Sequence, residues 1–273
     1  MSTSAPLQLG ASAWVALGML LLIALAVVVG PWLSPHAPDA IDFAAEWGGA
    51  PDRAHWFGTD SLGRDVFART LAGGRVSLLV GLVATVVAVV VGVAYGALAG
   101  YLGGRIDQWM MRAVDVLYAL PFMFIVILLM VAFGRELILI FVAIGLVNWL
   151  DMARIVRGQT LTLRTRGFVL AAQLYGMPAA AVVRRHIVPN LAATVVAYAT
   201  LTVPQVILIE SFLSFLGLGV SEPAVSWGSL IDDGARDMEV TPWALAFPTA
   251  FLTVTLLCLN LLGDSLRDAV KRT

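Results

Sequence analysis

Few side chains in this sequence are of a type that performs catalysis or binds a metal ion, and they are far apart along the chain. The histidines are His36, His55 and His186, and the only cysteine, Cys258, lies inside an apolar run. A zinc site needs several histidine, cysteine or carboxylate ligands together, and a hydrolase triad needs a nucleophile beside a histidine. Neither spacing is visible, so we expect no catalytic residue, no metal site and no cofactor in this chain. A single cysteine also excludes an internal disulfide.

Lysine is rarer still, because Lys271 is the only one. The phosphate-binding P-loop requires a lysine that follows a glycine-rich turn and precedes a helix. No lysine stands in that context, so this chain does not hydrolyse ATP by that route. If the process it serves uses ATP, another polypeptide must bind the nucleotide.

The composition is typical of a membrane protein. Hydrophobic residues make up 60% of the chain and charged residues 13%, against about 45–50% and about 25% in soluble domains. The apolar residues fall in blocks, and a helix needs ~20 of them to cross ~30 Å of hydrocarbon. The apolar blocks make membrane lipid an expected partner. The net charge is −1 and no basic face stands out, so nucleic acid is not an expected partner.

Six apolar blocks predict six transmembrane helices. They occupy residues 13–33, 76–100, 116–133, 137–153, 191–212 and 243–263. A cleaved signal peptide is the alternative for the first block, but it would need a basic region in front and a shorter apolar core. No charged residue precedes Asp39, which favours a retained span.

The basic residues orient these spans, because short cytoplasmic loops collect Lys and Arg. With both termini in the cytoplasm, eleven of the seventeen lie on that side: Arg105, Arg112, Arg154, Arg157, Arg164, Arg166, Arg184, Arg185, Arg267, Lys271 and Arg272. We therefore expect an N-in, C-in topology, which scatters the histidines over the two faces of the membrane.

The second span contains a repeat of small residues. Gly92, Gly96, Gly100 and Gly104 recur every four residues, which would line one helix face and let another helix approach closely. The alternative is that glycine is simply common in membrane helices.

Prolines and acids mark other positions within the spans. Pro204 and Pro248 each remove a helical hydrogen bond, which is tolerated beside neighbouring helices or a cavity. Glu210, near the outer end of the fifth span, could line a translocation path with Pro204, or could be solvated. Asp151 and Arg154 are three residues apart and could form an ion pair at the membrane edge.

The most informative segment lies between the fourth and fifth spans. Residues 168–175 predict a short helix ending at Gly176, since glycine is favoured just after a helix C-terminus. Pro178 suits the first turn of a second helix. The last turn of that helix is basic and a proline is expected to stop it: Arg184, Arg185, His186 and Pro189. Such a pair of helices could dock in a groove of a partner protein or rest on lipid headgroups.

The same stretch resembles the EAA signature of binding-protein-dependent ABC importer permeases. The matching positions are Ala171, Ala172, Gly176, Ile187 and Pro189. Further segments are similar to the C-type permease subunit of the oligopeptide/dipeptide branch, among them HWFGTDSLGRDVFAR (55–69), LDMARIVRGQTLTLR (150–164), ESFLSFLGLGV (210–220) and SWGSLI (226–231).

This resemblance implies an all-α membrane protein with the type I ABC importer transmembrane fold. Residues 1–75 would form the first span and an extracytoplasmic loop, and residues 76–273 the permease core with coupling helices at 168–186. The implied contacts with an ATPase are Leu170, Ala171, Ala172, Gly176, Arg184, Arg185, Ile187 and Pro189. Leu170 stands where the signature usually has glutamate, so a surface carboxylate expected in that contact is missing.

The resemblance also implies a function. The chain would be a permease subunit of an importer that moves oligopeptides across the bacterial inner membrane, and not itself an enzyme. Its partners would be a second permease, two ATPase subunits that bind ATP and Mg²⁺, an extracytoplasmic substrate-binding protein and the peptide. Dipeptides or a metal chelate are alternative cargoes. A stand-alone channel or secondary transporter would often show internal repeats, and a membrane enzyme would need converging catalytic side chains; neither is visible.

Overall fold

The computed structural model of the chain describes residues 10–43, 45–133, 137–220 and 222–272, and in those ranges it is all-helical apart from loops and two isolated β-bridges. The elements, in chain order, are α1 (Ala11–Leu33), α2 (Val66–Leu102), α3 (Gly104–Ala119), α4 (Phe122–Phe133), α5 (Leu137–Leu163), α6 (Gly167–Leu174), α7 (Ala179–Val182), the π-helix η1 (Val183–Ile187), α8 (Val188–Phe215), α9 (Trp227–Arg236) and α10 (Pro242–Arg272).

Among the described residues, four helices are long and apolar enough to cross a membrane. They are Ala11–Trp32, Val66–Leu102, Ala179–Phe215 and Pro242–Ala269, the third being the uninterrupted run of α7, η1 and α8. These four coincide with the first, second, fifth and sixth predicted spans. The total of six spans and their orientation stay predictions.

The third predicted span, 116–133, is not one helix. α3 ends at Ala119, and Leu120 is extended with φ −76° and ψ 132° before α4 begins. Pro121 explains the break, because a proline has no amide hydrogen and its ring disfavours helical backbone in the residue before it.

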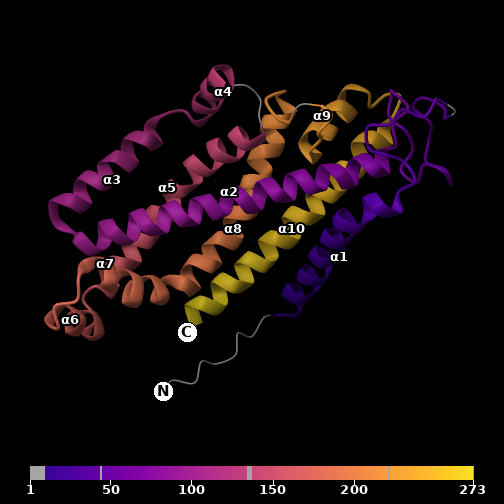
Figure 1. The fold of residues 1–273 in the computed structure, drawn as a ribbon. Coiled ribbons are helices and arrows are strands. Elements are labelled where there is room, and N and C mark those ends of the chain that lie inside the picture. Colours follow the sequence, from indigo (N-terminus) through magenta and orange to yellow (C-terminus); the bar gives the residue numbers. More distant parts are fainter. Residues whose placement is uncertain (1–9, 44, 134–136, 221, 273) are drawn as a thin grey trace.

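The long helices run side by side and separate two ends of the molecule (Figure 1). α6 and α7 lie at one end, close to the C-terminal end of α2, whereas residues 34–43 and 45–65 and α9 lie at the opposite end. α5, whose first part is the predicted fourth span at 137–153, packs along α2. The chain therefore presents two distinct surfaces, one at each end of the bundle.

Three of the repeated glycines in α2 lie where it meets α5. Gly92, Gly96 and Gly100 are all buried. A Cβ atom at Gly92 would lie 2.6 Å from the Cβ of Met152, and one at Gly100 would lie 2.8 Å from the Cβ of Thr160. Hydrogen is the only side chain that fits at these distances, so the glycines set how closely α2 and α5 approach.

Gly104 does not share that face. α2 ends at Leu102, and Gly104 begins α3 with φ +55°, where an added Cβ would meet nothing within 4 Å. The prediction of four glycines on one helix face is therefore wrong for Gly104, because the helix ends before the fourth repeat.

Candidate functional site

The segment between α5 and α8 folds as two short helical pieces joined by a tight turn. Gly176 follows α6 with φ +73°, a left-handed conformation that favours glycine. The N–H of Gly176 donates to the carbonyl of Gln173 over 2.9 Å, and the N–H of Met177 donates to the carbonyl of Ala172 over 3.1 Å. These bonds satisfy the carbonyls that the end of α6 leaves without helical partners.

One face of this segment fixes it to the bundle. Val169, Ala172 and Ile187 are buried and pack in one apolar cluster with Met152 and Val156 of α5. Fully burying a valine or isoleucine side chain contributes roughly 1.5–3 kcal/mol. The segment is therefore joined to α5 by packed side chains and to α8 by a continuous helix.

The other face of the segment is apolar and exposed. The exposed fractions are 46% for Leu170, 89% for Leu174 and 91% for Tyr175. A patch of exposed large apolar residues is typical of a contact with another protein or with a membrane. We refer to Leu170, Leu174 and Tyr175 as the α6 patch.

The predicted coupling residues fall into three groups by exposure. Leu170, Gly176, Arg184, Arg185 and Pro189 are exposed, Ala171 is half-buried, and Ala172 and Ile187 are buried. The first group is available to a partner, whereas the buried pair holds the segment in place. The ATPase contact itself stays a prediction.

The prediction that Pro189 stops the second helix is wrong. The helix runs without interruption from Ala179 to Phe215, with Pro189 in the first turn of α8. The preceding turn, η1, is a π-helix in which the N–H of Val188 donates to the carbonyl of Val183. The wider i→i+5 turn ends just before the proline, which lacks an amide hydrogen, and so lets the helix continue past it.

An ion pair and a hydrogen bond between neighbouring helices replace the predicted pair within α5. Arg154 donates to Asp115 of α3 over 2.9 Å, and the hydroxyl of Tyr118 donates to Asp151 over 2.8 Å. Arg154 also lies over the ring of Tyr118, 4.3 Å from its centroid. Asp151 and Arg154 therefore both join α5 to α3, a relationship that their spacing in the sequence does not reveal.

Glu210 is completely buried and is held by serine hydroxyls. Ser214 donates to its carboxylate over 2.7 Å and Ser77 over 3.1 Å. Ser77 in turn accepts the backbone N–H of Trp227 over 3.1 Å. Glu210 thus joins α8, α2 and the start of α9, and it is not solvated in this structure. Its predicted place on a translocation path, with the buried Pro204, stays a prediction.

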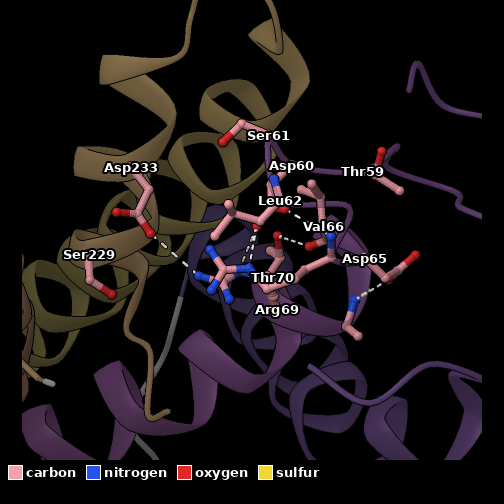
Figure 2. A network of polar contacts seen from close by, with 12 residues as sticks. Thr59, Asp60, Ser61, Leu62, Asp65, Val66, Arg69, Thr70, Ser229 and Asp233 are labelled. Carbon is pink, nitrogen blue, oxygen red and sulfur yellow. Dashed lines mark hydrogen bonds and ion pairs between the residues drawn. The ribbon is translucent and has the colours of Figure 1, made fainter. Parts of the chain in front are cut away.

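A second polar network lies at the opposite end of the molecule from α6 (Figure 2). Asp60 pairs with Arg64 over 2.7 Å and with Arg69 over 3.6 Å. Arg69 reaches Asp233 of α9 over 3.4 Å, and Arg64 reaches Glu222 over 2.7 Å. The network ties residues 34–65 and the start of α2 to α9. The sequence alone predicts only that Arg64 and Arg69 lie outside the membrane.

The pKa values of Glu222, which precedes α9, and of Asp233, which lies within α9, are shifted in opposite directions. The hydrogen bond from Arg64 holds the pKa of Glu222 below its ordinary value. Burial raises the pKa of Asp233, and the charge of Arg69 opposes that rise. Arg69 is itself almost fully buried, with 4% of its side chain exposed, so the acids around it are what compensate its charge.

Comparison with known proteins identifies the family. Residues 92–273 match the family described as binding-protein-dependent transport system inner membrane component, and residues 11–51 match the N-terminal TM domain of oligopeptide transport permease C. The chain belongs to the family of binding-protein-dependent transport system inner membrane components. The resemblance found in the sequence is thus confirmed, and the matched ranges include the α6 patch, η1 and Glu210.

Individual relatives cover most of the chain. It is 59% identical over 254 residues to the oligopeptide transport system permease protein OppC of Escherichia coli (strain K12), which covers 92% of this chain and 84% of that protein. It is 59% identical over 257 residues to OppC of Salmonella typhimurium, with the same coverage. It is 45% identical over 253 residues to the dipeptide transport system permease protein DppC of Bacillus subtilis, covering 92% of this chain and 79% of that one.

Two of the three histidines meet in the loop between α1 and α2. The rings of His36 and His55 stack with their centroids 4.4 Å apart, and Asp42 lies beside them. Both histidines belong to the loop predicted to lie outside the membrane, and His186 to the segment predicted to lie inside, so the expected distribution over two faces stays a prediction. Their loop has no helical or strand periodicity, so the sequence alone does not predict that these two positions meet.

Proposed function

We propose that this chain is one of two permease subunits of an ATP-driven importer of oligopeptides in the bacterial inner membrane. The names of the relatives support the cargo: two proteins at 59% identity are oligopeptide permeases. A dipeptide permease, at 45% identity, is more distant, so dipeptides are the second candidate.

The α6 patch is the observation that carries this proposal. It is exposed and apolar, it lies at one end of the bundle, and its buried side is packed onto α5. In a six-span, N-in, C-in topology this end is cytoplasmic, where ATPase subunits would dock. Arg184 and Arg185, exposed at the same segment, would meet acidic residues at the edge of that contact.

The proposed mechanism is alternating access. Two ATPase subunits bind ATP and Mg²⁺ and close on each other, which draws the coupling segments of the two permeases together. Because Val169, Ala172 and Ile187 are packed against α5, the motion reaches the spans and opens the path outward. A substrate-binding protein then releases peptide into the path from the side of residues 34–65 and α9, and hydrolysis returns the path to the inward state.

Leu170 distinguishes the contact in this chain. Its side chain is 46% exposed, so it stands at the docking surface in place of the usual carboxylate. The contact would then rest on apolar burial by Leu170, Leu174 and Tyr175. Restoring glutamate at Leu170 and measuring transport-coupled ATPase activity tests how far the apolar contact has replaced the ionic one.

The experiment for the proposal uses the complex reconstituted in proteoliposomes with its binding protein. Leu174→Asp places a charge in the α6 patch and should reduce both ATPase co-purification and ATP-dependent peptide uptake at least tenfold. Met238→Asp changes a side chain that is 55% exposed at the other end of the bundle and should leave ATPase co-purification intact. Normal co-purification of the ATPases with Leu174→Asp would overturn the proposal.

The cargo has its own test. The ligand that co-purifies with the cognate binding protein should be a peptide of several residues. A dipeptide would favour the second candidate, and a metal chelate would contradict both.

A further inference from the structure

Three side chains of metal-ligating type meet in the segment between α1 and α2. The donor atoms of His36, Asp42 and His55 all lie within 4.8 Å of one another. Nε2 of His55 is 3.5 Å from Oδ2 of Asp42. Two ligands bound at about 2.1 Å to one tetrahedral zinc ion are roughly 3.4 Å apart, so this pair already has the separation of two ligands on a shared ion.

Asp65 orients the central histidine for such a role. Its Oδ2 lies 2.8 Å from Nδ1 of His55, and both residues are buried, with 3% and 5% of their surface exposed. The contact of Nδ1 with Asp65 leaves Nε2 as the ring nitrogen that faces Asp42. Metal-binding histidines commonly donate their other N–H to a carboxylate in this way. Asp65 is also fixed in position, because it accepts the N–H of Ala68 over 2.7 Å at the start of α2 (Figure 2).

Nε2 of His55 faces the carboxylate of Asp42, and the rings of His36 and His55 stack. The other carboxylate oxygen of Asp42, Oδ1, accepts the N–H of Ala45 over 3.3 Å. A cation bound here would draw one ligand atom from each of the three side chains. Asp42 and His55 border one cavity, and His36 and Asp65 border a neighbouring one.

We propose that His36, Asp42 and His55 bind a divalent transition-metal ion, for which Zn²⁺ is the best fit, with water completing the coordination. Two imidazoles and one carboxylate form a donor set that suits zinc. The ion would link the chain just after α1 to the chain just before α2. It would thereby stabilise the segment that also contains Asp60 and Arg64 of the second polar network.

The test is a zinc titration of the purified full chain in detergent, prepared with a tag that contains no histidine and stripped of metal. Calorimetry should show one Zn²⁺ bound per chain. His36→Ala removes one ligand and should weaken binding at least tenfold, whereas His186→Ala, which also removes one histidine, should leave it unchanged. Asp65→Asn should weaken binding by about 10–100-fold, as loss of such an orienting partner does.

A stability readout covers the case in which a variant folds poorly. Zn²⁺ should raise the midpoint of thermal unfolding of the unchanged chain and of His186→Ala, and should not raise that of His36→Ala or the milder His36→Asn. Absence of zinc binding by the unchanged chain would overturn the proposal and leave His55 as the centre of an ion pair with two acids. Equal zinc affinity in the unchanged chain and His36→Ala would overturn it as well.

Discussion

Arg157 of α5 donates two hydrogen bonds, each 2.6 Å long, to the two carboxylate oxygens of Asp107 in α3. The planar guanidinium matches both oxygens at once, and Asp107 is buried, with 5% of its surface exposed. This pair fixes α3 to α5 close to the point where α5 leads into the coupling segment.

Replacement of Arg157 tests that link. Arg157→Ala leaves a buried carboxylate without its partner and should lower the free energy of unfolding by about 1–3 kcal/mol. Denaturation of the purified chain in detergent measures this change. Arg105→Ala removes an exposed arginine of α3 and should change stability by less than about 0.5 kcal/mol; equal effects of the two variants would contradict the role of the pair.

Because α2 and α5 approach closely, stability is expected to depend strongly on the size of the residues at the contact. Gly96→Ala places a methyl group against the backbone of Ala153, which cannot rotate aside, and should cost about 1–3 kcal/mol of stability. Gly158→Ala is the matched control, because a Cβ atom at this position of α5 meets nothing within 4 Å. It should be neutral or slightly stabilising, since alanine is the better helix former.

Substitutions at Glu210 distinguish a structural role of this residue from a role in transport. Glu210→Leu leaves the hydroxyls of Ser77 and Ser214 without their acceptor and should lower the free energy of unfolding by about 2 kcal/mol or more. Glu210→Gln keeps an acceptor oxygen and should lower it less. If Glu210 lines the path, Glu210→Gln should reduce peptide uptake while its unfolding midpoint stays near that of the unchanged chain. Full uptake by Glu210→Gln would assign the residue to folding alone.

The ion pair of Glu222 with Arg64 is expected to make a small, pH-dependent contribution to the stability of the fold. Arg64 holds the pKa of this carboxyl below its ordinary 4.5, so its contribution is present above the unfolded pKa and is lost as the pH falls through the folded pKa. The side chain is 67% exposed, which limits the contribution to less than about 1 kcal/mol. Glu222→Gln should therefore lower stability slightly at neutral pH and not in acid below the folded pKa. A loss that persists in acid would contradict this account.

Local patterns predicted much of the fold. The apolar blocks that became α1, α2, α8 and α10 are long enough to be read without tertiary information. Gly176 and Pro178 marked the turn between α6 and α7, because the backbone conformations these two residues favour are local properties. The break at Pro121 was equally local, yet the surrounding apolar run concealed it.

Contacts between distant segments could not be predicted. Ser77 and Glu210 are 133 residues apart, and their pairing depends on how α2 and α8 are packed. The prediction that Pro189 stops a helix is wrong because the π-turn before it is not encoded by any simple spacing. His36 and His55 meet only because their loop folds back at the start of α2.

Site-specific photo-cross-linking tests the central claim most directly. A photoreactive residue at Tyr175, which is 91% exposed in the α6 patch, should form an adduct with an ATPase subunit in the assembled complex. The same group at Trp56, which is 56% exposed at the opposite end, should form none. An ATPase adduct from position 56, or its absence from position 175 in a complex that still transports peptide, would contradict the assignment of this segment as the site where the motor acts.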